Sequence, residues 1–542
     1  MLVGVVVFAL NPVAVYAVGY LIQRSIVMAT GFALLSCACL VRGLLTRGAV
    51  AWAWHAGAFL ACVLAVLSKE HSLMLPLVAV VLYVYVRRPS AKQLAVMGGL
   101  GALALAVCAA VMWKSLGSIV GAAAFDETSG AYLAQLDALH PGFAQQAYAL
   151  SLINQAALFF VYGALWLLPN PGWLAMDLRP AFPLALTSMP QLIGALAFVA
   201  LALACVVVLL RRRDGWALAA VSVLCAQLLF SSEFITTWLQ DPFVLYRSYL
   251  WAAFLPGLVA AGLLGLGVQR KALLALAAVL GLVLAFLAHG RLQTLRTAEL
   301  AWGDAAAKVD MQAPVNAVGR WRPFLNRGAA LLDEGQTEAA LADFNRAVDL
   351  GEPLGAAAMS QGMALQTLGR HEAAVKALEQ ARTQGMKHPM LAYHLGVSQR
   401  ATGNISGALV NLQQAAQTVT DPQVKLRVLQ DLGETALPAR DLDLAEQAFA
   451  GMLAIEPNNV RGEIGKGMVL LGRQQLPAAM AAFDAALARQ DNAMAHFGKA
   501  MVFMEQGDLV RARQSAARAQ AIDPTSPNIA ALLQHLQRVG GP

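Results

Sequence analysis

Four of the five basic residues that stand outside the basic clusters of the N-terminal half could do chemistry through their charges. They are Arg24, Lys69, Arg179 and Arg247. Arginine can bind a phosphate through two parallel N–H donors, and lysine can neutralise one as a point charge. If these cations lie near one membrane surface, they could bind a phosphate group there, supported by the carboxylates of Glu70 and Asp177. The alternative is that they extend to the membrane interface or form ion pairs with Glu70, Asp177 and Asp241.

Other sequence motifs associated with catalysis are absent. The chain has no Walker A phosphate loop, no Gly-x-Ser-x-Gly nucleophile elbow and no His-Glu-x-x-His zinc motif, so nucleotide hydrolysis, esterase and zinc-protease functions lack support. All six cysteines lie in apolar segments, which excludes a disulfide framework or a zinc cluster elsewhere in the chain. From these patterns we assign no catalytic residue, metal site or cofactor.

The elements that position these residues must come from two unlike halves of the chain. The 542 residues are 58% hydrophobic and 13% charged, whereas a soluble protein carries about 25% charged residues. Residues 1–290 contain 15 Lys/Arg and 8 Asp/Glu, and residues 291–542 contain 24 of each. The net charge of +7 therefore belongs to the apolar half, where basic connections flank membrane helices. It gives no reason to expect a nucleic-acid partner.

Apolar segments of membrane-spanning length fill residues 1–290. Crossing the hydrocarbon takes roughly 20 apolar residues, and several stretches approach that length. They are 25–41, 49–67, 72–86, 94–113, 149–168, 191–210, 215–231, 248–268 and 272–288. A shorter apolar segment before Asn11-Pro12 brings the total to about ten, and we expect it to be the end of a helix that begins before Met1. The sequence thus predicts an all-α, polytopic membrane domain over 1–290.

Basic clusters between these segments predict the orientation of the chain. They are Arg42/Arg47, Arg87/Arg88/Lys92, Arg211–Arg213 and Arg270/Lys271, and such connections remain in the cytoplasm. An odd number of apolar segments separates the second cluster from the third, so either 149–168 does not cross or an extra pass lies near 115–125. Both solutions predict a bacterial inner-membrane protein whose C-terminal half is extracytoplasmic. They also place the four isolated cations on that outer face.

A period of about 34 residues runs through the C-terminal half. Small residues recur at one position in each repeat: Gly328, Gly362, Gly396, Gly433, Gly467 and Ala500. Twelve residues later comes another small residue, such as Ala340, and sixteen residues later a large one in the first five copies: Phe344, Leu378, Leu412, Phe449 and Phe483. Two helices that pack closely at small positions are typical of the tetratricopeptide repeat.

These repeats predict the organisation and the partners of the C-terminal half. Six copies and a closing helix over 526–539 predict an α-solenoid over 320–542, which a linker over 291–319 joins to the membrane domain. Such arrays usually offer a concave groove to another protein, so we expect a protein or peptide partner besides membrane lipid. The alternative is a spacer or a dimerisation module. The groove side chains are mixed in character and indicate no class of ligand.

Several segments also resemble one known family. They are Asn11-Pro12-Val13 with Tyr20–Ser25, Leu67–His71 with Leu75-Pro76, Trp166–Pro171 with Asp177, and Tyr246–Trp251 with Pro256-Gly257. In order and spacing they resemble the GT-C membrane glycosyltransferases with C-terminal tetratricopeptide repeats, the transmembrane and tetratricopeptide-repeat-containing O-mannosyltransferases and their bacterial relatives. The chain departs from the family pattern at Asn11, at Ala14–Tyr16 and at Tyr246. The family's acidic catalytic loop would precede residue 1.

This resemblance implies transfer of a sugar from a polyprenyl-phosphate donor to a protein or glycan acceptor outside the cytoplasm. Arg247, Lys69, Arg24 and Arg179 would bind the donor phosphate, and the repeats would recruit the acceptor or a partner. Two alternatives remain open. One is a non-enzymatic, membrane-anchored scaffold for envelope or pilus assembly. The other is an O-antigen polymerase-like or ligase-like protein, although residues 114–148 are poor in Arg and His for its large loop.

Overall fold

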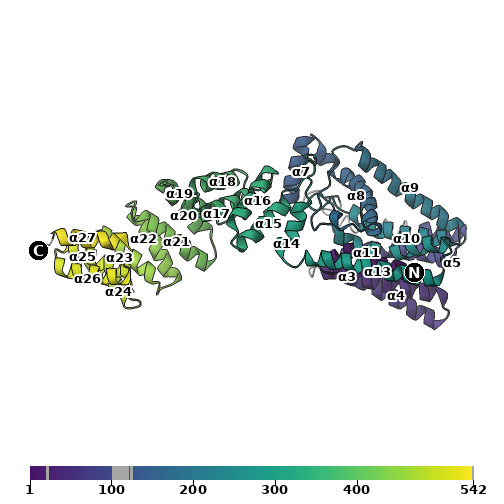
Figure 1. The fold of residues 1–542 in the computed structure, drawn as a ribbon, viewed down its shortest axis with the longest axis horizontal. Helices are drawn as coiled ribbons and strands as arrows, with labels where there is room; N and C mark the ends of the chain where they lie inside the picture. The colour runs from purple at the N-terminus through teal and green to yellow at the C-terminus, as the bar shows by residue number, and fades with distance from the viewer. Residues whose placement is uncertain (20–22, 100–120, 123–125, 540–542) are drawn as a thin grey trace. The chain divides into compact units, whose positions relative to one another are not determined.

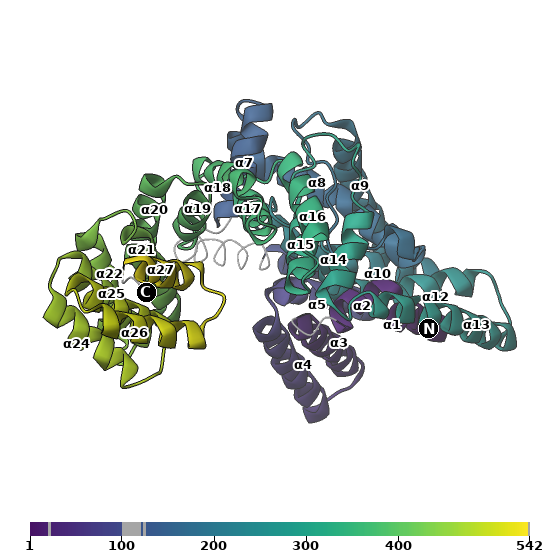
Figure 2. The same cartoon turned by 60° about the vertical axis from the view of Figure 1, so that its left-hand side comes forward.

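The computed structural model describes residues 1–19, 23–99, 121–122 and 126–539, and every regular element in these ranges is helical. The described chain forms two compact units, one of residues 1–335 with 346–353 and one of residues 336–345 with 354–542 (Figures 1 and 2). An all-α chain with apolar helices in its N-terminal part and repeats in its C-terminal part is therefore confirmed.

The first unit contains helices of very different length. The shorter helical segments are α1 (Leu2–Ala9), η1 (Pro12–Ala14), α2 (Val15–Val18), η3 (Glu70–Met74), α5 (Leu75–Arg87), α7 (Glu127–Leu139), η4 (Pro171–Trp173), η5 (Ser231–Phe234), η6 (Leu245–Ser248), α11 (Tyr249–Ala252), α12 (Leu255–Gly265), α14 (Ala298–Ala307) and α15 (Arg322–Asp333). The longer helices are α3 (Arg24–Leu45), α4 (Ala49–Ser68), α8 (Phe143–Leu167), α9 (Met189–Arg211), α10 (Gly215–Phe230) and α13 (Arg270–Gln293).

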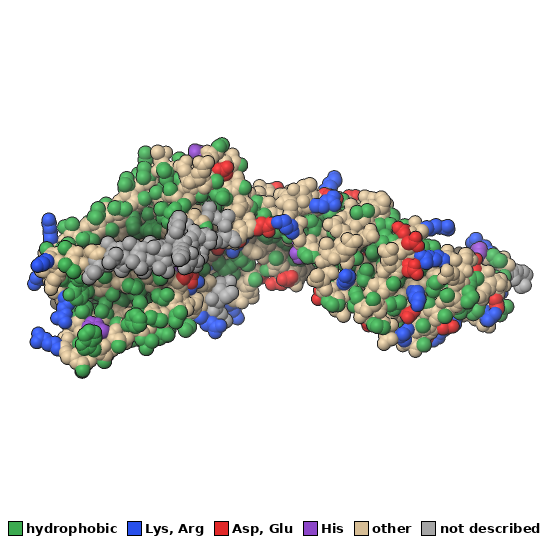
Figure 3. All heavy atoms as spheres, turned by 180° about the vertical axis from the view of Figure 1, so that it is seen from behind, with side chains coloured by type: hydrophobic (Ala, Val, Ile, Leu, Met, Phe, Trp, Pro, Cys, Tyr) green, Lys and Arg blue, Asp and Glu red, His purple; other side chains and the backbone are tan. Residues whose placement is uncertain are grey.

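Seven helical segments in the described residues are long and apolar enough to cross a membrane. They are α3, α4, η3 with α5, α8, α9, α10 with η5, and α13. A bent pair, η6 continued by α11 and then α12, with 57° between its two parts, could form an eighth. Only 11% of the most apolar stretch of α9 and of α13 is buried, so these helices present apolar side chains outward, as lipid-facing helices do. Figure 3 shows such side chains over much of the visible face of this unit.

One contact bears on the predicted orientation. The Arg88 guanidinium donates to the carbonyl oxygen of Leu209, so the cluster at Arg87/Arg88 and the cluster after α9 lie at the same end of the unit. The stretch 149–168 belongs to α8, a helix of 25 residues that is long enough to cross. The alternative segment near 115–125, and most of the predicted span 94–113, lie outside the described residues.

The segment predicted as a linker, 291–319, is held against the first unit by several polar contacts. The ammonium group of Lys308 donates to the carbonyl oxygens of Leu174 at 2.6 Å and Pro171 at 3.0 Å. Asn316 exchanges two hydrogen bonds with the backbone of Phe182, at 2.6 and 3.0 Å. Because these bonds fix both helix α14 and the chain after it, the segment forms part of the first compact unit.

The repeats form consecutive antiparallel helix pairs. After α15, the helices are α16 (Thr337–Asp349), α17 (Ala356–Thr367), α18 (His371–Thr383), α19 (Leu391–Ala401), α20 (Ile405–Thr418), α21 (Pro422–Ala436), α22 (Leu442–Ile455), α23 (Val460–Gly472), α24 (Leu476–Leu487), α25 (Ala493–Glu505), α26 (Leu509–Ile522) and α27 (Pro527–Val539). The closing helix predicted over 526–539 is α27, which buries Leu532 and Leu536 against α25 and α26.

Glycines let large side chains enter the spaces between these helices. A Cβ on Gly433 would lie 2.5 Å from the Phe449 ring, and one on Gly467 would lie 2.6 Å from the Phe483 ring. These glycines and phenylalanines are the small and large positions that the sequence predicts. Two further glycines are not predicted by that pattern: a Cβ on Gly465 would lie 2.2 Å from the Phe449 ring, and one on Gly498 would lie 2.3 Å from the Phe483 ring. Each phenylalanine therefore packs between its own repeat and the next.

Gly465→Ala should destabilise the repeats by about 1–3 kcal/mol, since the added methyl group overlaps the buried Phe449 ring. The matched control is Gly451→Ala, where the nearest atom is the flexible end of Leu429 at 3.1 Å and alanine adds helix propensity of about 1 kcal/mol. Urea unfolding of fragment 336–542, followed by circular dichroism, measures both. Equal midpoints for the two variants would refute the packing described for Gly465.

Candidate functional site

Sequence segments far apart in the chain meet at one end of the first unit. Asn11 begins the short helix η1, because its side-chain oxygen accepts a hydrogen bond from the backbone N–H of Val13 at 3.0 Å. The Asn11 amide donates to the carbonyl oxygen of Trp166 at 2.9 Å, and the Trp166 indole donates to Ser248 Oγ at 2.8 Å. All three polar partners are buried. The Asn-Pro, Trp166 and Tyr246–Trp251 segments are therefore joined directly.

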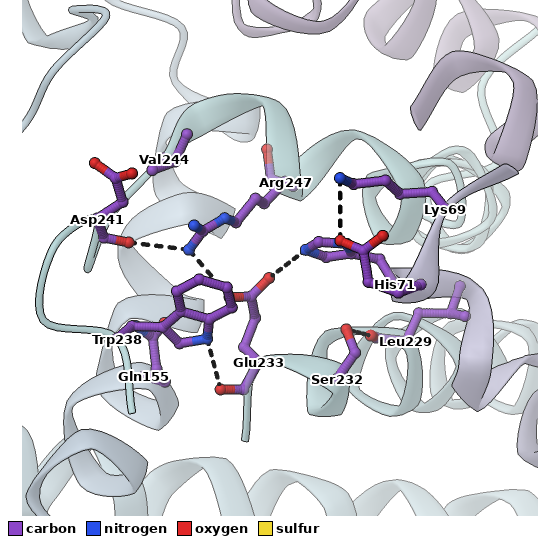
Figure 4. A network of polar contacts seen from close by, with 12 residues as sticks. Lys69, His71, Gln155, Leu229, Ser232, Glu233, Trp238, Asp241, Val244 and Arg247 are labelled. Carbon is purple, nitrogen blue, oxygen red and sulfur yellow. Dashed lines mark hydrogen bonds and ion pairs between the residues drawn. The ribbon is translucent and has the colours of Figure 1, made fainter. Parts of the chain in front are cut away.

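The Leu67–His71 segment reaches the same region through a row of charged side chains, here called the chain of charges. Lys69 Nζ lies 3.0 Å from Glu70 Oε1, and His71 Nδ1 lies 3.2 Å from that oxygen, at ion-pair distance but without hydrogen-bond geometry. His71 Nε2 lies 3.1 Å from Glu233 Oε1. Glu70 is exposed, whereas His71 and Glu233 are buried. The charged side chains thus lead from exposed Glu70 to the buried carboxylate of Glu233, whose contact with His71 is drawn in Figure 4.

Arg247 closes this chain of charges. Its Nη1 lies 3.5 Å from Glu233 Oε2 and donates to the carbonyl oxygen of Asp241 at 2.9 Å. Its guanidinium lies over the Trp238 ring, 3.7 Å from the centroid (Figure 4). Because only 6% of Arg247 and 4% of Glu233 are exposed, each charge offsets much of the cost of burying the other. This environment fits an arginine that positions its neighbours.

A second cluster of charges lies beside the first. Arg179 Nε lies 2.6 Å from Asp177 Oδ1, and Arg322 Nη1 lies 2.6 Å from Asp241 Oδ1. Arg179 also lies 3.4 Å from Asp241. Burial alone would raise the pKa of Asp241, but Arg322 and Arg179 outweigh it and hold that pKa below its usual value. Burial would lower the pKa of Arg179, but Asp177 more than compensates. Both groups are therefore charged at neutral pH.

A cavity of about 220 Å³ opens beside this second cluster. Its walls combine carboxylates, an arginine, an amide and aromatic rings: Tyr16, Gln23, Met176, Asp177, Asp241, Val244, Leu245, Tyr246, Leu295, Trp302 and Arg322. The side chains of Asp241 and Arg322 are 33% and 30% exposed, while those of Asp177 and Arg179 are 8% and 3% exposed. A ligand in this cavity, here called the polar pocket, would therefore meet Asp241 and Arg322 first.

A larger cavity of about 580 Å³ lies against one face of α8. Its lining is mostly apolar, with charged residues interspersed: Leu158, Val161, Ala164, Leu165, Trp173, Asp177, Leu178, Arg179, Pro180, Ala181, Phe243, Lys308, Val309, Asp310, Ala313, Pro314 and Arg320. Asp177 lines both cavities. The combination suits a ligand with an apolar chain and a polar end.

The residues predicted from the sequence divide into three groups. Lys69, Glu70 and Arg247 belong to the chain of charges, and Arg179 and Asp177 belong to the second cluster. Arg24 is exposed at the start of α3 and makes no ion pair within the described ranges. Lys69 and Arg179 form ion pairs with the carboxylates named in the alternative, whereas Arg247 pairs with Glu233, which the sequence analysis does not name. Their binding of a donor phosphate stays a prediction, as does the supporting role of Glu70 and Asp177.

Several residues of the site were not predicted. Glu233 and Trp238 follow the end of an apolar helix, and Tyr16, Trp302 and Arg322 line the polar pocket. An acidic residue at the end of a membrane-spanning segment is itself a signal, because such residues are rare there and usually have a partner. The positions of Trp302 and Arg322 carry no comparable signal, since both fall in the segments expected to be linker and repeat.

Comparison with known proteins identifies the C-terminal half. A family profile described as tetratricopeptide repeat matches residues 359–424 and 464–527, and repeats of this kind generally bind proteins or peptides. No curated protein matches the chain. The C-terminal half is therefore a tetratricopeptide array suited to protein–protein interaction.

Solved structures that match part of this chain include a chain from a functional characterization of Pseudomonas aeruginosa pilF. It is 17% identical, with a TM-score of 0.32, and the match covers 40% of this chain and 97% of that one. A second is YrrB, described as a TPR protein with an unusual peptide-binding site, at 18% identity, a TM-score of 0.25 and coverage of 39% and 91%. A third is a repeat protein from Parabacteroides merdae, at 14% identity, a TM-score of 0.31 and coverage of 44% and 91%.

Proposed function

We propose that this chain is a membrane glycosyltransferase that takes a sugar from a polyprenyl-phosphate donor and passes it to a protein or glycan acceptor outside the cytoplasm. The observation that carries the proposal is the meeting of the four motif segments. The chain from Lys69 to Arg247 and the bonds from Asn11 to Ser248 bring them together next to the polar pocket. The two sets of contacts end on the neighbouring residues Arg247 and Ser248 of η6.

The cavities suggest how the parts of a donor would be bound. A polyprenyl chain needs an apolar surface, which the cavity against α8 supplies, and a sugar needs hydroxyl-binding groups, which the polar pocket supplies. Transfer leaves a phosphate with an additional negative charge, and fixed cations stabilise such a charge. Lys69 and Arg24 are the accessible members of the predicted set. Arg179 and Arg247 are buried, so we assign them to positioning Asp177, Asp241 and Glu233.

The repeats would recruit the acceptor or an assembly partner. The family match over two blocks of repeats supports this part, because such arrays bind proteins along their surface. The repeats have their own apolar cores, including the cluster around Phe449 and Met452. They can therefore hold a partner without rearranging the membrane helices.

Glycan mass tests this proposal. A strain from which the gene is deleted should lose a sugar from its envelope glycoproteins, and the wild-type gene should restore it. Asp241→Asn should not restore it, whereas Asp214→Asn should, because Asp214 is exposed and starts α10 next to the Arg211–Arg213 cluster. Mass spectrometry of the glycoproteins gives the result. Unchanged glycoproteins in the deletion strain would overturn the proposal.

A second candidate function is a membrane-anchored scaffold without enzymatic activity. The observation that favours it is the internal pairing of the cations, since Arg179 and Arg247 already have carboxylate partners. A scaffold would need only the repeats and a membrane anchor. Fragment 336–542 attached to an unrelated membrane helix should then restore the wild-type phenotype to the deletion strain. The transferase proposal predicts that this fusion fails.

The proposal requires the repeats to be extracytoplasmic. The contact between Arg88 and Leu209 places two basic clusters at one end of the unit, and Figure 3 shows Lys and Arg side chains gathered at one end of that unit. Reporter fusions after residue 213 and after residue 300 should therefore report opposite sides of the membrane. Two reporters on the same side would refute this orientation.

A further inference from the structure

We propose that the segment between the last apolar helix and the repeats, together with the first residue of α15, supplies part of a carbohydrate-binding site, in which Trp302 and Arg322 bind one neutral sugar ring together with Asp241 and Tyr246. The inference rests on the proposed function, because that ring would be the sugar of the donor or of the acceptor. It assigns ligand contacts to a region that the sequence suggests is only a connection.

The chemistry of the polar pocket fits a sugar ring. The aromatic side chains of Tyr16, Tyr246 and Trp302 offer apolar faces for the C–H groups of a pyranose. The Asp241 carboxylate accepts hydrogen bonds from hydroxyl groups, and the Arg322 guanidinium donates them. Both side chains are about one-third exposed, so both can be reached without opening the buried pair behind them.

Charge and size favour a single neutral ring over a phosphate or a longer glycan. The two carboxylates of the second cluster are balanced by the two guanidinium groups of Arg179 and Arg322, which leaves no excess positive charge for a free anion. The cavity of about 220 Å³ is smaller than the roughly 300–1,000 Å³ that drug-sized ligands fill. One ring therefore fits its chemistry and its volume better than a chain of sugars.

The segment is fixed firmly enough to act as a binding wall. Arg291 donates to the carbonyl oxygen of Leu174 at 2.7 Å and lies 3.0 Å from Asp304. Lys308 and Asn316 donate hydrogen bonds to backbone carbonyl oxygens in the same stretch, between Pro171 and Phe182. Gly319 has φ +85°, and a Cβ there would lie 2.8 Å from the Tyr132 hydroxyl. These contacts fix the backbone on both sides of Trp302 and just before Arg322. A ligand would therefore bind without first ordering this wall of the pocket.

Saturation-transfer NMR on the full-length protein in lipid nanodiscs tests this site. The probes are the methyl α-pyranosides of mannose, glucose and galactose and of N-acetylglucosamine. Wild type should show transfer to at least one of them, and Trp302→Ala and Arg322→Ala should weaken that binding by roughly tenfold or more. The matched controls are Trp52→Ala, which changes an exposed tryptophan of α4 outside both cavities, and Arg296→Ala, which changes an exposed arginine outside the pocket.

The outcomes separate this inference from the proposed function. Loss of probe binding in Trp302→Ala and Arg322→Ala, with probe binding retained in both controls, supports the site. Equal binding by wild type and the pocket variants overturns the assignment of Trp302 and Arg322, and so does binding of none of the probes by wild type. Neither of these results alters the glycan-mass experiment, whose failure would overturn the proposed function instead. Size-exclusion profiles that match wild type confirm that each variant is folded.

Discussion

Phe483→Asp should unfold the C-terminal repeats. The Phe483 side chain is completely buried, and it packs between glycines of two neighbouring repeats, Gly467 and Gly498. Removing the ring costs about 3–5 kcal/mol, and an aspartate in its place must bury an unpaired charge as well. Together these costs approach or exceed the roughly 5–15 kcal/mol that stabilises a typical domain.

Circular dichroism of fragment 336–542 measures this effect as loss of helix and of the cooperative melting transition. The matched control is Phe483→Leu, because leucine occupies the equivalent positions 378 and 412 and is completely buried there. The control should keep the melting transition with a modest decrease in its midpoint. A wild-type melting curve for Phe483→Asp would mean that the packing described for these repeats is wrong.

Arg247→Met should strongly destabilise the first unit and abolish sugar transfer. The substitution leaves the Glu233 carboxylate buried without its main partner, and breaking a buried pair in this way costs about 3–5 kcal/mol. The double variant Glu233→Gln/Arg247→Met removes both charges and should recover most of the stability. Thermal unfolding of the purified full-length protein in detergent is measured for Arg247→Met, for Glu233→Gln and for the double variant, which completes a double-mutant cycle.

The same cycle decides what Arg247 does. If Arg247 positions its neighbours, the double variant should regain part of its transfer activity along with its stability. If Arg247 itself binds the donor phosphate, the double variant should be stable and inactive. Arg247→Lys should be intermediate, because an ammonium group cannot stack on Trp238 as a planar guanidinium does. An Arg247→Met variant as stable as wild type would refute the stabilising role of the buried ion pair between Arg247 and Glu233.

The elements that the sequence predicts best are those with a strong local pattern. The apolar spans need only length and composition, so α3, α4, α8, α9 and α13 could be placed within a few residues. The repeats need only a period, and Gly433 and Gly467 fall where that period expects them. Gly465 and Gly498 were missed because they contact the preceding repeat, and a pattern within one repeat does not reveal such neighbours.

The site was harder to predict, because its contacts join residues far apart in the chain. Arg247 was identified from its position and its resemblance to a motif, but its partner Glu233 and the Trp238 ring are visible only in three dimensions. The segment 291–319 lacks a repeat, so the sequence predicts a linker there. In the fold, Trp302 of this segment and Arg322 of the first repeat helix line the polar pocket with Asp241, and Arg322 pairs with Asp241.

Reconstituted transfer tests the central claim most directly. Full-length protein in nanodiscs is mixed with polyprenyl-phosphate donors that carry radiolabelled mannose, glucose, galactose or N-acetylglucosamine, and with envelope proteins from the deletion strain. The account predicts that one donor is consumed, that polyprenyl phosphate is released and that the label appears on protein. Asp241→Asn should abolish this transfer and Asp214→Asn should not. Failure of a folded wild-type preparation to transfer label from any of these donors would contradict the account.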